Sequence, residues 1–576
     1  MKDNESLQPN KQKKVNALVK KGYVNAFIAL SLVIAIAMGI TAGTYSLMKS
    51  DKDTVVELWG NTGDEYYYSG MLDEAINEYS TLQKEDKWPE WTIKIAQVYS
   101  LKGEVEKANS LIREAVILRD RALEEDVEKY KDRDKQFIND VVYLLINNNE
   151  LDEAISFGKD YLEDHEDNNI VKSIFYAYML KGNTEQAKKI MGSYQTDEES
   201  AFDLARFAKM QIVSGNIEDG LKTLRKAWQT DSDEIEILNV LNDIAMYDKN
   251  VLIKKINTLN TNKDDVYNIF LAAVYANDSA NAKKAGSILE NVKEEISQGI
   301  NYNIIKAEMY NTLKDEKSAK EAIDEILDSK EESYAVYYFK AWNSYYAEEY
   351  DQALEYCKKS IDLNREFADN YGLLMTAIKR AKGETGIEAY YNLALQMDPF
   401  NYAIALDEAD YYENYNNNYD KAEEALRYAI KISKNGEIYY RLAQIEIKKE
   451  NSENAIKYYK KAIELDVTNL KYYRAVARLY LADGQYENCI ETLRTAYQID
   501  DTDVLVLNDI ACYYLTEEEN IERAFSNIEA AYNEIPKTID ADNKTIITNN
   551  YDKIKKAYNK YNKTGTLNIP EVELCK

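Results

Sequence analysis

The sequence predicts an all-α fold in which short helix pairs stack as a solenoid, preceded by one N-terminal transmembrane helix. The 576 residues include only 5 Pro and 20 Gly, a composition typical of helices joined by short turns. One uncharged, apolar run lies near the N-terminus. Most of the remaining chain repeats with a period of 34 residues, and a fixed period of this length indicates stacked structural repeats.

The N-terminal segment has the pattern of a membrane anchor. Residues 1–21 are polar and rich in Lys, whereas residues 22–48 contain no charged residue and are strongly apolar at their centre. A bilayer-spanning helix needs about 20 apolar residues, and the apolar core of a cleavable signal peptide has only about 7–15. We therefore predict a retained transmembrane signal anchor at residues 22–48. Cleavage near Ile40-Thr41-Ala42 is the alternative.

The lysines predict the orientation of this anchor. Five lie close to the N-terminal end of the apolar run, whereas the linker at residues 49–55 mixes Lys49 and Lys52 with two Asp. Because Lys and Arg concentrate on the cytoplasmic side of a span, we expect residues 1–21 in the cytoplasm and everything after residue 49 outside it. The alternative is a membrane-tethered adaptor whose repeats face the cytosol.

The most regular repeat covers residues 436–469. Its pattern predicts one helix at 438–449, a polar break, and a second helix at 453–465. Ala443 and Ala455 are expected where the two helices cross, because small residues let two backbones approach closely. One such pair is too small to bury its apolar stripe alone, so it requires neighbours of the same kind.

Those neighbours continue in phase over residues 266–537. Successive repeats begin 34 residues apart, at Val266, Ile300, Tyr334, Ala368, Tyr402, Gly436, Leu470 and Val504. The eighth position of each repeat is almost always Ala: Ala273, Ala307, Ala341, Met375, Ala409, Ala443, Ala477 and Ala511. Chance does not hold such a phase over eight repeats.

Outside this regular part the repeats drift in phase. We expect about 14 helix pairs over residues 56–537, with a short, degenerate pair at 234–263 and a charge-rich insertion at 119–135 that extends a helix. In the C-terminal region, 538–576, a helix at 550–561 has one apolar face and suits the cap that a solenoid needs. Residues 565–576 read as a loose tail.

The first repeat supplies a family signature. Trp59, Gly63 and Tyr66 follow the spacing W-x3-G-x2-Y, and Ala75 and Tyr79 come at the corresponding places in the second helix. Together with the period, this resembles the tetratricopeptide repeat (TPR). The anchor and a composition rich in Lys, Asn, Ile and Tyr resemble membrane TPR proteins of low-GC bacteria.

The TPR resemblance implies a right-handed superhelix with a groove that binds an extended peptide or a partner helix. Its lining comes from positions 2, 5, 9, 12 and 13 of the first helix in each repeat. In this chain, the candidate partner-binding residues at those positions are Tyr338, Trp342, Tyr345, Lys379, Arg380, Lys448, Lys471, Arg474 and Arg478.

Two groups of these residues suggest binding. Lys471, Arg474 and Arg478 share one helical face and predict recognition of an acidic or carboxylate-bearing peptide through charge-assisted hydrogen bonds. The alternative is that they pair with acidic neighbours in adjacent repeats. The aromatic group around Trp342 suits an interface, although a chain with 49 Tyr places aromatic residues on every face.

Composition argues against several other functions. The net charge is −29, and residues 1–50 are positive, so the repeats are strongly acidic and unsuited to nucleic acid. One His and four scattered Cys leave little scope for acid–base chemistry or a zinc site. His165 lies in an acidic inter-repeat loop, and Cys489 and Cys512 read as buried thiols or as a disulfide.

No catalytic or cofactor motif is present. We therefore expect no enzyme activity, cofactor or metal, and a protein–protein interaction scaffold instead. The alternative is a ligand-binding protein or an enzyme with an unrecognised site among the acidic residues.

Overall fold

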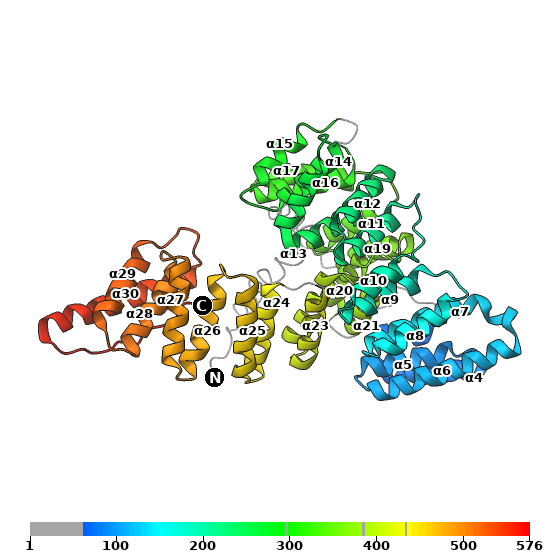
Figure 1. Cartoon of the computed structure of the whole chain (residues 1–576), viewed down its shortest axis with the longest axis horizontal. Helices are drawn as coiled ribbons and strands as arrows, with labels where there is room; N and C mark the ends of the chain where they lie inside the picture. Colours follow the sequence, from blue (N-terminus) through cyan, green and yellow to red (C-terminus); the bar gives the residue numbers. More distant parts are fainter. Residues whose placement is uncertain (1–60, 294–297, 383–385, 433–434) are drawn as a thin grey trace, which may run out of the picture. The chain divides into compact units, whose positions relative to one another are not determined.

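The computed structural model describes residues 61–293, 298–382, 386–432 and 435–576, and within them every secondary-structure element is an α helix (Figure 1). The predicted cytoplasmic tail, anchor and linker lie outside these residues. Among the described helices, none combines the length and apolar character needed to cross a bilayer.

The described residues form two compact units, one up to residue 408 and one from residue 409 on, with the boundary inside α22. The helices up to that boundary are α3 (Thr62–Tyr68), α4 (Leu72–Glu85), α5 (Glu90–Leu101), α6 (Val105–Glu125), α7 (Val127–Asn147), α8 (Leu151–Leu162), α9 (Asn168–Leu180), α10 (Thr184–Met191), α11 (Ala201–Val213), α12 (Ile217–Thr230), α13 (Glu236–Leu259), α14 (Asp265–Ala276), α15 (Ala282–Leu289), α16 (Ile300–Thr312), α17 (Glu316–Leu327), α18 (Tyr334–Tyr346), α19 (Tyr350–Leu363), α20 (Asp369–Lys382), α21 (Ile387–Met397) and α22 (Tyr402–Asn414).

The second unit continues with the most regular repeats. Its remaining helices are α23 (Tyr419–Ile432), α24 (Gly436–Lys448), α25 (Ser452–Leu465), α26 (Leu470–Ala482), α27 (Tyr486–Ile499), α28 (Val504–Thr516), α29 (Ile521–Asn533) and α30 (Ala541–Thr564).

Small residues hold the two helices of each repeat together, as the 34-residue phase predicts. Ala443 of α24 and Ala455 of α25 are both fully buried, and all eight residues at the eighth repeat position are at most 2% exposed. In the first repeat the same logic applies to Gly63, since a Cβ there would collide with the ring of Tyr79 in α4. The α-solenoid prediction is therefore confirmed for the described repeats.

The turn inside a repeat needs one residue in the left-handed conformation. Glu450 has φ 60° between α24 and α25, and Gly484 has φ 72° at the equivalent place between α26 and α27. The next residue of the first turn, Asn451, caps α25 by accepting a hydrogen bond from the Asn454 amide. This geometry explains why the break at residues 450–452 is short and polar.

Three local predictions differ from the structure. The stretch at 234–263 is not a helix pair but the single 24-residue helix α13, because no Gly or Pro interrupts its apolar period. The insertion at 119–135 lengthens two helices, α6 and α7, which break at Asp126. The C-terminal helix α30 is longer than the predicted 550–561.

In the first unit, one face of α7, α9, α11 and α13 is covered by residues 366–369 and 392–400 of the same unit. The Tyr143 hydroxyl donates to the Asn392 carbonyl (2.5 Å), and Lys172 Nζ donates to the Met397 carbonyl (3.1 Å). Burial and the nearby Arg206 lower the pKa of Lys172 to about 7. The first unit thus fills its own inner face with its own helices.

A buried ion triad ties this covering segment down. Lys209 Nζ lies 2.7 Å from Asp243 Oδ2 and 2.6 Å from Asp398 Oδ2, and its side chain is 6% exposed. Burial raises the pKa of Asp243, and the ammonium group of Lys209 opposes that shift. The triad joins α11, α13 and the loop after α21.

We expect Lys209→Ala to destabilise the first unit by about 3–5 kcal/mol, because it leaves two carboxylates together in the interior. Lys222→Ala is the control, since that side chain is 57% exposed and pairs only with Asp219, so its loss costs at most about 1 kcal/mol. Hydrogen exchange of the α11 and α13 amides measures the difference. Equal exchange in the two variants would show that the triad does not stabilise this unit.

Candidate functional site

The predicted basic face lies on α26 and pairs with both neighbouring repeats. Lys471 Nζ lies 3.1 Å from Glu437 Oε1 of α24 and 3.8 Å from the centre of the Tyr440 ring. Arg474 Nε donates to Asp509 Oδ2 of α28 at 2.9 Å, and Arg478 Nη2 lies 3.5 Å from the same oxygen. The alternative prediction, pairing with acidic neighbours across repeats, is therefore confirmed for all three residues.

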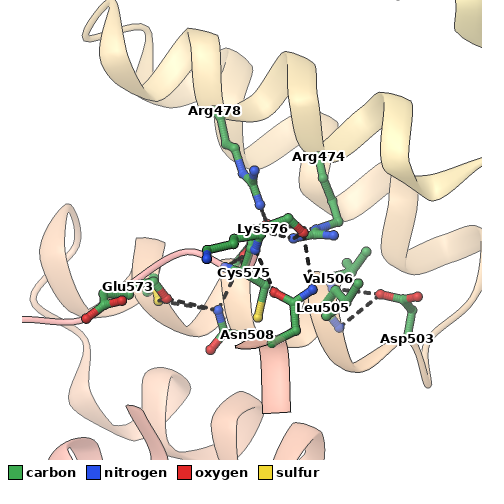
Figure 2. A network of polar contacts seen from close by, with 12 residues as sticks. Arg474, Arg478, Asp503, Leu505, Val506, Asn508, Glu573, Cys575 and Lys576 are labelled. Carbon is green, nitrogen blue, oxygen red and sulfur yellow. Dashed lines mark hydrogen bonds and ion pairs between the residues drawn. The ribbon is translucent and has the colours of Figure 1, made fainter. Parts of the chain in front are cut away.

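The same face also holds the end of the chain. Residues 566–576, which we call the tail, leave α30 after Gly565, and their last residues lie between Arg474 and Asn508 (Figure 2). Arg474 Nη2 donates to the Cys575 carbonyl at 2.7 Å, and the Cys575 amide donates to Asp509 Oδ1 at 3.1 Å. The expectation of a loose tail is wrong.

Asparagine side chains bind the tail main chain one step earlier. Asn550 Nδ2 donates to the Glu573 carbonyl at 2.6 Å, and the Glu573 amide donates back to Asn550 Oδ1 at 3.1 Å. Asn508 Nδ2 reaches the same carbonyl at 3.2 Å, and its Oδ1 accepts from Asn550. Asn508 and Asn550 are 0% and 1% exposed, so the tail closes over them.

A third asparagine holds the last residue. The Lys576 amide donates to Asn543 Oδ1 at 2.6 Å, and Asn543 Nδ2 lies 3.4 Å from the Lys576 carbonyl oxygen. The Lys576 ammonium group lies 2.9 Å from Asp542 at the start of α30. We call Arg474, Asn508, Asp509, Asn543 and Asn550, on α26, α28 and α30, the tail-binding face.

One tail side chain enters the core. Cys575 is fully buried in the apolar cluster of the second unit, and Val572 packs partly against the same cluster. Burial raises the pKa of the Cys575 thiol to about 12, and the Asp509 carboxylate adds to the shift. The thiol therefore acts as a small apolar side chain. Cys489 and Cys512 are also buried free thiols.

The repeat pattern does not predict most residues of the tail-binding face, although the register assigns one of them to a groove position. Asn508 stands at the fifth position of the Val504 repeat, the position that Arg474 occupies one repeat earlier. Asn543 and Asn550 lie in α30, outside the 34-residue phase, and Asp509 occupies no groove position. Only the fold brings them beside residues 573–576.

The other candidate residues lie apart from this face. Lys448 Nζ pairs with Glu413 Oε1 at 2.7 Å. Tyr338 and Trp342 are only 2% and 5% exposed, packed against aromatic neighbours such as Phe367, so the expected exposed aromatic patch is absent there and their partner-binding role stays a prediction. Tyr345 is half-buried. The side chains of Lys379 and Arg380 lie outside the described residues.

The described residues contain no cluster of three or more His, Cys, Asp or Glu side chains placed to hold a metal ion. His165 is exposed and stacks on the Tyr161 ring, with the ring centres 4.2 Å apart. The tail-binding face instead forms hydrogen bonds to a peptide main chain, through Arg474, Asn550 and Asn543 among others.

We expect Asn550→Ala to release the tail, because both main-chain hydrogen bonds of Glu573 to this side chain are lost. At about 0.5–1.5 kcal/mol net per bond, hydrogen exchange of residues 572–576 should accelerate about 5- to 160-fold. Asn559→Ala, at an exposed position of the same helix, should leave the exchange unchanged. Unchanged exchange in Asn550→Ala would mean that these contacts do not hold the tail.

Comparison with solved structures finds distant similarity over much of the chain. The Naa15/Naa10 complex bound to HypK-THB is 15% identical, with 87% of this chain and 96% of that chain covered and a TM-score of 0.36. Yeast Tom70 is 15% identical, with 82% and 94% covered and a TM-score of 0.33. YrrB, described as a TPR protein with an unusual peptide-binding site, is 19% identical over 32% of this chain and 95% of its own, with a TM-score of 0.26. Similarity at this level carries no argument about partners.

No curated protein matches the sequence. The family model of the tetratricopeptide repeat matches residues 436–468 and 470–503, which form α24–α27 and include the basic face of α26. These two matched repeats share their helix-pair packing and their buried small residues with the other repeats of the structure. Residues 436–468 and 470–503 are thus two tetratricopeptide repeats within an array of similar helix pairs.

Proposed function

We propose that the protein is a membrane-anchored scaffold that binds an extended segment of a partner protein on its tail-binding face, outside the cytoplasm. One observation carries the binding part of this proposal: all five side chains of the tail-binding face bond to main-chain atoms of residues 573–576. A surface that already binds the main chain of one peptide segment in this way has the chemistry to bind another.

Main-chain recognition explains the residue types on this face. Asn offers a donor and an acceptor on one rigid amide, so Asn550 satisfies both polar groups of a single peptide residue. Arg474 adds a charge-assisted hydrogen bond to a carbonyl, which is stronger than a neutral one. Such contacts supply affinity for an extended chain, and side-chain seats between them supply specificity.

The location rests on the sequence alone. The apolar run at 22–48 is long enough to span a bilayer, and the lysines before it favour a cytoplasmic N-terminus. The short linker at residues 49–55 would then hold the acidic repeats close to the side of the membrane that faces away from the cytoplasm. A scaffold in this position holds its partners close to the membrane.

The proposed topology predicts which side of the membrane reacts with an impermeant maleimide. Lys457→Cys, at a position 63% exposed in α25, should label in intact cells, whereas Asn10→Cys should label only after lysis. The unsubstituted protein is the blank, since its four cysteines are buried. The reverse labelling pattern would identify a cytosol-facing adaptor instead.

A photo-crosslinking residue at position 478 tests the partner-binding role. The Arg478 side chain is 33% exposed beside the tail, and position 457 on the opposite helix of the neighbouring repeat is the control. We expect an intermolecular adduct at 478 and none at 457, mapped to one segment of the partner that, as a synthetic peptide, prevents the crosslink. Adducts that join position 478 only to residues 566–576 would contradict the proposal.

A further inference from the structure

We infer that the tail is a built-in competitor for the partner and that its residues define the partner's chemistry. The partner segment is extended, carries an apolar side chain three residues before a small apolar one, and continues with a basic residue. This inference rests on the function proposed above. Beyond that function, it specifies the class of peptide segment that binds, and it requires that the tail leave the tail-binding face before the partner binds.

The surroundings of the Cys575 side chain determine which residue type the partner segment needs at this position, namely a small apolar one. This side chain is fully buried in the apolar cluster of the second unit, to which residues of α28 and α30 also belong. Its two main-chain polar groups are bound by Asp509 and Arg474, so the side chain cannot shift outward without breaking those bonds. A larger or charged side chain would overfill this seat or bury a charge, and either outcome weakens binding.

At the next position, that of Lys576, a nearby acidic side chain determines which residue type is favoured. Lys576 Nζ lies 2.9 Å from Asp542, at the acidic first turn of α30, in a pair that is largely exposed. A basic residue is therefore favoured there, although an exposed pair of this kind adds only a modest preference. Glu573, by contrast, is bound through its main chain while its side chain remains exposed, so this position accepts many residues.

The apolar position before the seat is Val572, which packs partly against the core cluster. Before it, Leu567 also packs partly against this cluster, and Lys553 Nζ donates to the Glu571 carbonyl at 3.0 Å. Most of residues 562–571 are nevertheless exposed, and Ile569 is 43% exposed. The tail therefore leaves α30 as an exposed tether and is held mainly by its last five residues.

This arrangement makes the tail exchangeable. At Gly565 the chain turns in the left-handed conformation, with φ 68°, and nothing lies within 4 Å of where a Cβ would be. A short, exposed tether keeps the tail at a millimolar effective concentration, so a partner segment must compete with it. Segments with few buried contacts open far more often than the whole fold.

Two full-length variants release the tail without changing the tail-binding face. Cys575→Asp places a charge in the apolar seat, and Glu573→Pro removes the amide that donates to Asn550. Asn568→Ala, at an exposed tail position, is the matched control. Hydrogen exchange verifies that α24–α29 keep their protection and that residues 572–576 lose theirs.

The probe is a fluorescent peptide with the sequence of residues 566–576, added to each full-length protein and followed by anisotropy. We expect at least 10-fold tighter binding to Cys575→Asp and Glu573→Pro than to the unsubstituted protein and to Asn568→Ala. In the peptide itself, Cys575→Ala should retain binding, Cys575→Lys should abolish it, and Lys576→Glu should weaken it severalfold.

Three outcomes would overturn the inference. Equal affinity of all four proteins, with the tail shown to be released in two of them, would mean that the tail is not a competitor. A peptide with Cys575→Lys that binds as well as the original would remove the small apolar position from the partner's description. Dimers formed by tail exchange between two copies would make a second chain the occupant.

The crosslinking experiment separates this inference from the proposed function. An intermolecular adduct at position 478 whose partner segment lacks the tail-like pattern would retain the scaffold and reject the ligand class. Absence of both the adduct and peptide binding would reject the two together.

Discussion

The structure depends on the close approach of two helices at small residues. A helix pair of about 34 residues cannot bury an apolar stripe alone, so its stability comes from neighbours packed in the same way. Ala443 and Ala455 allow this in one repeat, and the equivalent residues allow it in the others. Because the helices pack so closely, side chains of adjacent repeats come within hydrogen-bonding distance. Asp509 of α28, for example, accepts a hydrogen bond from Arg474 of α26.

Asp509 shows how that closeness becomes recognition. Its side chain is 2% exposed and accepts hydrogen bonds from Arg474 and from the Cys575 amide. A carboxylate in this position is costly unless both oxygens are satisfied. Arg474 is likewise buried, and its second contact is the Cys575 carbonyl. The ion pair therefore presents a donor and an acceptor at the spacing of one peptide residue.

Whether a feature of the structure could be predicted from the sequence depends on how far apart along the chain its interacting residues lie. Ala443, Ala455 and the break at 450–452 follow from a local period, and the structure matches them. Lys471, Arg474 and Arg478 could be placed on one face by helical spacing, and their acidic partners could be anticipated as an alternative. These are properties of one repeat or of two adjacent ones.

The tail could not be predicted in the same way, because its contacts connect remote parts of the chain. Arg474 and Cys575 are 101 residues apart, and nothing periodic marks residues 572–576. Asn543 and Asn550 lie in a helix outside the repeat phase, so no register assigned them a face. The burial of Tyr338 and Trp342 could not be predicted for a related reason: Phe367, between α19 and α20, packs on the Tyr338 ring, and Trp342 packs on the same ring.

In each unit, a later segment of the chain covers one face of the preceding helices. The two covering segments differ in how much apolar surface they bury. In the first unit the cover includes Phe400, which is 4% exposed and packs on Phe175 and Tyr176 with ring centres 5.5 and 5.3 Å away. Burying about 150–250 Å² at about 25 cal/mol/Å² makes one such ring worth about 4–6 kcal/mol, before the helices around it are counted.

The tail, which covers the face in the second unit, buries one small thiol and parts of Val572 and Leu567, and its main-chain hydrogen bonds contribute about 0.5–1.5 kcal/mol each. It is also connected to α30 by an exposed tether and is not part of another helix of the array. Displacing it costs a few interactions and leaves every repeat intact, whereas displacing α20 and α21 would dismantle the first unit. The tail is thus the cover that an incoming peptide can replace.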